Sequence, residues 1–131
     1  MPSARKKTSA QQPPNAAAVF SVLRQILEKH KNGLVAKVDE PGNYGLETKA
    51  PVYRGRPLWI AAVQTKKNYV SFHLTPIYMF PDLLKDLTPA LKKRKQGKGC
   101  FNFTAIEPAL FEELDRLTEA GFSRVRNAKF P

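Results

Sequence analysis

The first periodic segment of the chain has the spacing of an α-helix. Its apolar positions recur every three or four residues and therefore share one face: Val19, Phe20, Leu23, Ile26 and Leu27, with His30 at the end of the row. Asn15 is a suitable N-cap, and Gly33 suits the left-handed residue that follows a helix end. The spacing predicts an amphipathic helix that must pack on another element.

The next forty residues change to a strand-like alternation. LVAKVDE and YGLETK flank a Pro-Gly-Asn turn, and a hairpin is expected to fold over Arg54-Gly55. In the segment YVSFHLT two sets alternate, Val70, Phe72 and Leu74 against Tyr69, Ser71 and His73. Residues two apart share a face of a strand, so the first set is expected in a core and the second on the opposite face.

The second half of the chain carries helix signals around one more strand. Two prolines interrupt the pattern near residue 80, and a short helix is expected from Asp82. Thr88-Pro89 predicts a helix start, with the helix ending near Gly97, and GCFNF predicts a last strand. The final helix is expected from Pro108 to Gly121, with a buried stripe of Leu110, Phe111, Leu114 and Leu117.

This order of elements predicts an α+β domain, an antiparallel sheet with two main helices packed on one face. The domain is expected over residues 16–122. Residues 1–15 are rich in charge, Ser, Gln and Pro and are expected to form a disordered basic arm, and residues 123–131 a basic C-terminal tail.

Composition restricts the possible settings of the protein. The longest apolar run, residues 58–63, is far shorter than the ~20 residues that cross a bilayer, so no membrane association is expected. A lone cysteine cannot form an internal disulfide, which favours the cytosol. The formal net charge of +11 favours an anionic partner.

Three stretches resemble the bacterial YdhG-like domains of unknown function: KNYVSFHLTPIY (residues 67–78), LTPALKKRKQGKGCFNF (residues 87–103) and LFEELDRLTEAGF (residues 110–122). The resemblance implies a frataxin-like fold, in which an antiparallel sheet is flanked by helices, and it implies no established reaction. Frataxin-like proteins bind iron through carboxylates on and near their first helix, so the resemblance also implies an iron-binding chaperone of iron–sulfur assembly as an alternative. Here that helix offers only Glu28 among cations.

A basic turn is the first candidate binding site. It comprises Lys92, Lys93, Arg94, Lys95, Gly97, Lys98 and Gly99. Backbone amides around the two glycines, with lysines beside them, are able to hold phosphate or a carboxylate. Helix termination is the alternative explanation, because cations and a glycine are both common at helix C-termini. The GxxxxGK[ST] pattern of a P-loop is absent.

The outer face of the sheet is the second candidate. It is expected to carry Tyr53, Trp59, Tyr69, Ser71, His73 and Asn102. An aromatic sheet face with basic edges suits single-stranded nucleic acid, since every base has a face that stacks. Aromatic residues are also common on strands for reasons of packing alone.

Metal binding and catalysis have little support in the sequence. His30, His73 and Cys100 are far apart and lack metal-ligand spacing, and no cofactor is expected. Ser71 and His73 share a face, but no third residue is identified that would orient the histidine, so an enzyme is not expected. The sequence therefore predicts a small non-enzymatic module that binds an anionic ligand or an acidic protein, with a nucleic-acid-binding domain as another alternative; it does not indicate an oligomeric state.

Overall fold

A six-stranded antiparallel sheet forms the centre of the molecule, in the strand order β1-β2-β3-β4-β6-β5. The computed structural model describes residues 15–49 and 54–128. The strands are β1 (Leu34–Glu40), β2 (Asn43–Thr48), β3 (Trp59–Thr65), β4 (Val70–Leu74), β5 (Lys95–Gln96) and β6 (Cys100–Phe103). Tyr53, residues 1–14 of the expected arm and residues 129–131 lie outside the described residues.

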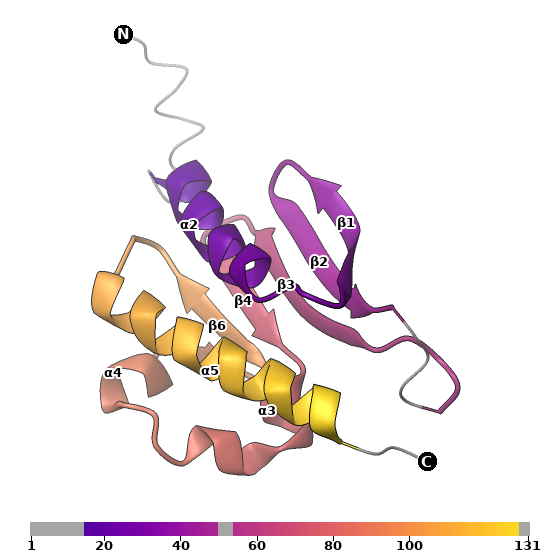
Figure 1. The fold of residues 1–131 in the computed structure, drawn as a ribbon. Coiled ribbons are helices and arrows are strands. Elements are labelled where there is room, and N and C mark those ends of the chain that lie inside the picture. Colours follow the sequence, from indigo (N-terminus) through magenta and orange to yellow (C-terminus); the bar gives the residue numbers. More distant parts are fainter. Residues whose placement is uncertain (1–14, 50–53, 129–131) are drawn as a thin grey trace, which may run out of the picture.

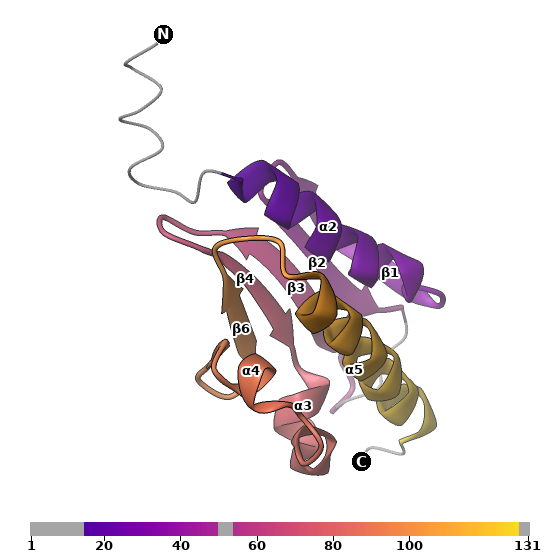
Figure 2. The ribbon, with the colours of Figure 1, turned by 90° about the vertical axis from the view of Figure 1, so that its left-hand side faces the viewer.

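Two long helices, α2 (Ala16–Lys29) and α5 (Pro108–Asn127), cover one face of this sheet (Figures 1 and 2). Three single-turn elements, α3 (Pro76–Met79), the 3₁₀ helix η1 (Pro81–Leu84) and α4 (Pro89–Lys92), lie at one end of it. This arrangement confirms the expected α+β class. Within the described residues, no helix has both the length and the apolar character that crossing a bilayer requires.

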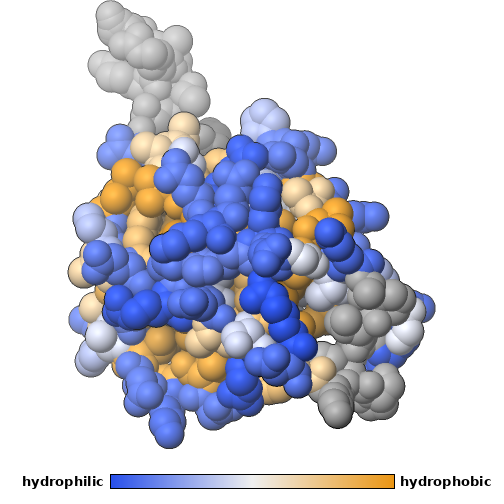
Figure 3. All heavy atoms as spheres, viewed as in Figure 1, coloured by the Kyte–Doolittle hydropathy of each residue, from blue (hydrophilic) through white to orange (hydrophobic). Residues whose placement is uncertain are grey.

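The core lies between the two long helices and the sheet. Val70, Phe72 and Leu74 of β4 are completely buried there, as their alternation predicts. The predicted stripes of both helices are buried against them. Hydrophilic side chains dominate the opposite, solvent side of the helix layer (Figure 3), as expected of amphipathic helices.

The basic segment after Thr88 folds differently from the expectation. Thr88 caps α4 as predicted, since its hydroxyl accepts a hydrogen bond from the backbone N–H of Leu91. The helix, however, ends at Lys92, well before Gly97. After a turn at Lys93 and Arg94, Lys95 and Gln96 form β5 and pair with β6. Gly97 adopts a left-handed φ of 66° in the turn between the two strands. Strand pairing has overridden a sequence with high helix propensity.

The expected stop of the last helix at Gly121 is also wrong, because α5 continues to Asn127. Gly121 serves close packing: a Cβ there would lie 2.9 Å from the Cβ of Pro76. Phe122 and Val125 beyond it are buried in the core. Residues 123–127 are therefore part of this helix and not of a separate basic tail.

The segment around β2 and β3 also differs in detail from the predicted hairpin. The strand that pairs with β3 is β2, and the backbone N–H of Thr48 donates to the carbonyl of Leu58 at 3.0 Å. Arg54 and Gly55, both with positive φ, lie in the connection between the two strands. At the N-terminus, Asn15 precedes α2 but its side chain makes no capping hydrogen bond.

Candidate functional site

Two rows of side chains cross the face of the sheet that α2 and α5 leave uncovered. Strand alternation and register place Asn43, Gln64, Ser71 and Asn102 side by side in the first row. They place Gly45, Ala62, His73, Cys100 and Gln96 in the second. Four of these nine residues are amides, so this face is built for hydrogen bonding more than for packing.

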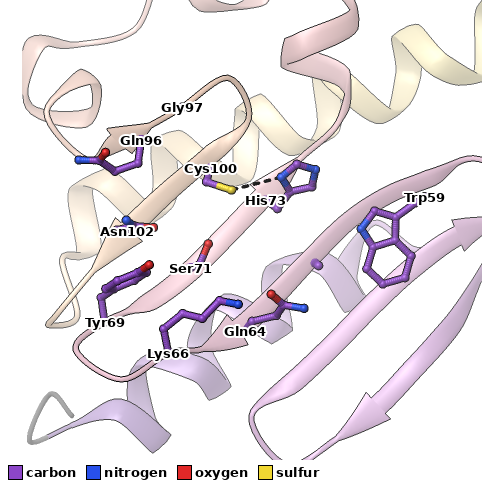
Figure 4. Close-up of a pocket in the computed structure, with 11 residues that line it drawn as sticks. Trp59, Gln64, Lys66, Tyr69, Ser71, His73, Gln96, Gly97, Cys100 and Asn102 are labelled. Atoms are coloured by element: carbon purple, nitrogen blue, oxygen red, sulfur yellow. Dashed lines mark hydrogen bonds between the residues drawn. The ribbon is translucent and has the colours of Figure 1, made fainter. Parts of the chain in front are cut away.

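A hollow of about 480 Å³ lies over these rows, and we call it the sheet-face hollow (Figure 4). Its lining residues are Trp59, Ala62, Gln64, Lys66, Tyr69, Ser71, His73, Gln96, Gly97, Cys100 and Asn102. The structure therefore brings together every predicted sheet-face residue that it describes. Only Gly97 joins them from the predicted basic turn.

Trp59 forms one end wall of the hollow, and a glycine permits its position. A Cβ on Gly45 would overlap the indole ring, so the ring lies directly against the backbone of β2. The pairing of β2 with β3 has a bulge-like register shift between Leu46 and Glu47, and Glu47 is the residue paired with Trp59. The aromatic wall therefore depends on the missing side chain at Gly45.

Tyr69 stands at the opposite end of the hollow from Trp59 (Figure 4). The turn between β3 and β4 fixes it, because the backbone N–H of Lys66 donates to the Tyr69 carbonyl at 2.7 Å. The exposed side chain of Lys66 extends along the face toward Gln64. The hollow thus has an aromatic ring at each end and an ammonium group at its rim.

The floor between the aromatic walls offers both donors and acceptors. The amide nitrogen of Gln64 donates to the side-chain oxygen of Asn43 at 3.2 Å, which orients that pair. Ser71 and Asn102 are paired neighbours on the next two strands. Hydroxyl and amide groups without charge recognise polar ring edges by hydrogen bonding.

His73 and Cys100 form a contact pair on the same floor. The imidazole Nδ1 of His73 lies 3.3 Å from Cys100 Sγ (Figure 4). Its Nε2 lies 3.1 Å from the hydroxyl of Thr75. Burial lowers the pKa of His73 from its ordinary value of 6.5, so the ring is neutral at pH 7. A neutral histidine disfavours the thiolate–imidazolium pair of cysteine catalysis. Ser71, which shares this face of β4 with His73, takes part in neither contact.

The lining of the hollow contains one basic residue and no acidic residue. The basic residue is Lys66. Strand alternation places Glu40 and Glu47 on the same open face of the sheet, at the edge formed by β1 and β2. Several acidic residues elsewhere are paired with cations, as at Asp115, whose carboxylate lies 3.0 Å from Lys29 and 2.6 Å from His30. Burial raises the pKa of Asp115, but the hydrogen bonds from His30 and Lys29 outweigh it and hold the pKa below its ordinary value.

The predicted basic turn does not form a single anion site. Arg94 makes a bidentate ion pair with Glu107 at 2.8 and 2.9 Å, and this pair raises the pKa of the guanidinium. The carbonyl of Gly99 accepts a hydrogen bond from the backbone N–H of Leu74, which gives this glycine a role in the sheet. Lys95 is paired in the sheet with the buried Phe101. Its side chain therefore points to the helix side of β5, away from the sheet-face hollow. Arg94 and Gly99 are thus committed to the fold, and Lys95 points away from the sheet-face hollow.

Metal ligands do not gather in the described part of the chain. Residues 15–49 and 54–128 hold no group of three or more His, Cys, Asp or Glu side chains that would bind a metal ion. His30 is bonded to Asp115 between α2 and α5, whereas His73 and Cys100 lie on the other side of the sheet.

Sequence reasoning missed five lining residues: Ala62, Gln64, Lys66, Gln96 and Cys100. The sequence held a signal for Gln64, because residues two apart on a strand share a face and Gln64 is two residues after Ala62. Its partner on the next strand is Ser71. No signal existed for Gln96, because its strand has only two residues in a segment predicted to be helical. Comparison with protein-family models, curated proteins and solved structures gives no match for this chain.

Proposed function

We propose that the protein is a non-enzymatic cytosolic binding module whose sheet-face hollow takes an anionic ligand with a planar, hydrogen-bonding ring, as in a nucleotide. The observation that carries the proposal is the pair of aromatic walls, Trp59 and Tyr69, at the ends of a carboxylate-free floor. A base stacks on an aromatic ring irrespective of its identity. Amides on the floor match its polar edges, and Lys66 at the rim attracts phosphate.

Binding has more support than catalysis at this site. The neutral state of His73 leaves Cys100 without a cationic partner in the hollow except the more distant Lys66. The resemblance to the YdhG-like domains agrees with this proposal, since it brings no reaction with it. The alternative of an iron-binding chaperone has less support, because Glu28 of α2 already lies 3.4 Å from Arg24.

The single tryptophan makes the proposal directly testable. Trp59 is the only tryptophan of the chain, so its fluorescence reports on the end wall of the hollow. Titration with adenosine and uridine monophosphates is expected to quench this emission to saturation. The nucleosides without phosphate are expected to bind more weakly, because they cannot use Lys66.

A pair of tyrosine variants supplies the control. Tyr69→Ala removes one aromatic wall and is expected to weaken nucleotide binding by about 5- to 100-fold, the effect of losing one stacked base. Tyr78→Ala changes a tyrosine outside the hollow lining and is expected to leave mononucleotide affinity unchanged. Absence of a saturable change with any nucleotide, or equal effects of the two variants, would reject the proposal.

A further inference from the structure

A second hollow, of about 300 Å³, lies beyond the β5–β6 hairpin, and we call it the edge hollow. Its lining residues are Ile77, Tyr78, Pro81, Leu84, Lys95 and Lys98. The ring of Tyr78 is unusually open to solvent, since 56% of the residue is exposed, more than any other large hydrophobic residue in the described part of the chain. An exposed aromatic ring beside two lysines is a combination that the fold itself does not require.

The lysines of the edge hollow have no acidic partner among the described residues. Lys98 places its ammonium 5.8 Å from the centre of the Tyr78 ring, and Lys95 donates a hydrogen bond to the carbonyl of Gly97 at 2.7 Å. Two more lysines, Lys92 and Lys93, are exposed just before β5. None of these four forms an ion pair with a described residue, in contrast to Arg94 between them.

The acidic residue that follows Pro81 of the edge hollow has a cationic partner. Asp82 follows Pro81 in η1, and Arg124 holds its carboxylate at 2.7 and 3.2 Å. The hydrogen bond from Arg124 lowers the pKa of Asp82, so this carboxylate stays paired at neutral pH. Asp82 is therefore not free to neutralise the lysines of the hairpin.

The two hollows share one hairpin. Gln96 and Gly97 line the sheet-face hollow, and Lys95 and Lys98, their immediate neighbours, line the edge hollow. Gly97 has no side chain to separate the two, and a Cβ there would meet nothing within 4 Å. Because Lys95 lies on the helix side of β5, a ligand that reaches both hollows has to cross this hairpin.

We propose that the ligand is a single strand of nucleic acid, which occupies the sheet-face hollow and continues over the β5–β6 hairpin to Tyr78. This inference rests on the function proposed above and names the class of ligand. A mononucleotide carries one phosphate group and one base, whereas this surface offers several lysines and three aromatic rings, Trp59, Tyr69 and Tyr78. Successive phosphates and unpaired bases of one strand match such a surface, and a duplex does not, because its bases are stacked on each other.

The test compares an oligonucleotide with a mononucleotide on the same variants. Fluorescently labelled oligouridylate and oligothymidylate of about twelve nucleotides are titrated by anisotropy, and uridine monophosphate by Trp59 emission. The edge variants are Tyr78→Ala and the double variant Lys95→Gln with Lys98→Gln. The matched control is Lys31→Gln with Lys37→Gln, which removes the same charge from exposed positions outside both hollows. Thermal unfolding checks that each variant is folded.

Binding at both hollows has a specific signature. The oligonucleotide is expected to bind at least ten times more tightly than the mononucleotide, and the edge variants are expected to remove most of that gain. The Lys95/Lys98 variant is expected to reduce the slope of log affinity against log salt by about 1.4, since each phosphate contact on a single strand contributes about 0.7. Mononucleotide affinity should stay unchanged in all edge variants. A preference for one oligonucleotide distinguishes RNA from DNA as the source of the strand.

The contrary results are separable. If the mononucleotide binds but the oligonucleotide binds no more tightly, or the edge variants match the Lys31/Lys37 control, the inference fails and the proposed function stands. If both lysine pairs weaken the oligonucleotide equally, its binding is unspecific charge attraction and the inference also fails. If no nucleotide changes the emission of Trp59, the proposed function fails and the inference with it.

Discussion

The two faces of β4 are built from neighbouring residues under different constraints. Val70, Phe72 and Leu74 are completely buried under the helix layer, whereas Ser71 and His73 face the sheet-face hollow. Ser71 is only 8% exposed, although no helix covers it. Its neighbours across the sheet are Gln64 and Asn102, and the residue belongs to the lining of the hollow. One face is therefore determined by packing, and the other keeps polar groups in a shielded position where a ligand can reach them.

The largest expected effect is a difference in the free energy of unfolding between substitutions on the two faces. Phe72→Ala should lower the free energy of unfolding by about 3–5 kcal/mol, because it removes a completely buried ring and leaves a cavity. Ser71→Ala, one residue away on the same strand, should change it by less than about 1 kcal/mol. Urea unfolding of both variants measures the difference. Similar losses at the two positions would mean that the open face is also structural.

The next effect tests whether the open face is shaped by Gly45. Gly45→Ala should destabilise the protein by about 1–3 kcal/mol, since the new methyl group overlaps the Trp59 ring. The displaced indole should also shift its fluorescence emission.

The control for Gly45→Ala is a double-mutant cycle with Trp59→Phe. The smaller ring should relieve most of the overlap, so the two changes together should cost less than their sum. Additive losses would show that Gly45 has another role than accommodating the tryptophan.

A smaller effect distinguishes the cations of the basic segment. Arg94→Gln breaks the bidentate pair with Glu107 and should cost about 1 kcal/mol, an amount limited by the partial exposure of both side chains. Lys95→Gln, the adjacent position, should leave stability within about 0.5 kcal/mol of the wild type because its ammonium has no acidic partner among the described residues. Equal effects, measured by thermal unfolding, would contradict the division of this segment into structural and ligand-facing cations.

These comparisons show what the sequence can predict. Alternation depends only on neighbours along the chain, and it assigned both faces of β4 and the outward direction of Asn102 correctly. The partner of Arg94 was not predictable, because Glu107 comes beside it only through the return of β6. The end of the last helix was missed for a similar reason: Gly121 resembles a stop signal in sequence, but its role is set by contact with Pro76 on another element.

The smallest expected effect concerns the protonation of the open face. Burial lowers the pKa of His73, so the folded protein binds a proton there less readily than the unfolded chain does. Stability should therefore fall as the pH drops from the ordinary value of 6.5 toward the lowered folded value, and it should level off below that. The ring signals of His73, followed by NMR, should titrate below 6.5, and His73→Gln should remove this part of the pH dependence. A midpoint at or above 6.5 would mean that the imidazole is more accessible to water than its position beside Cys100 and Thr75 implies.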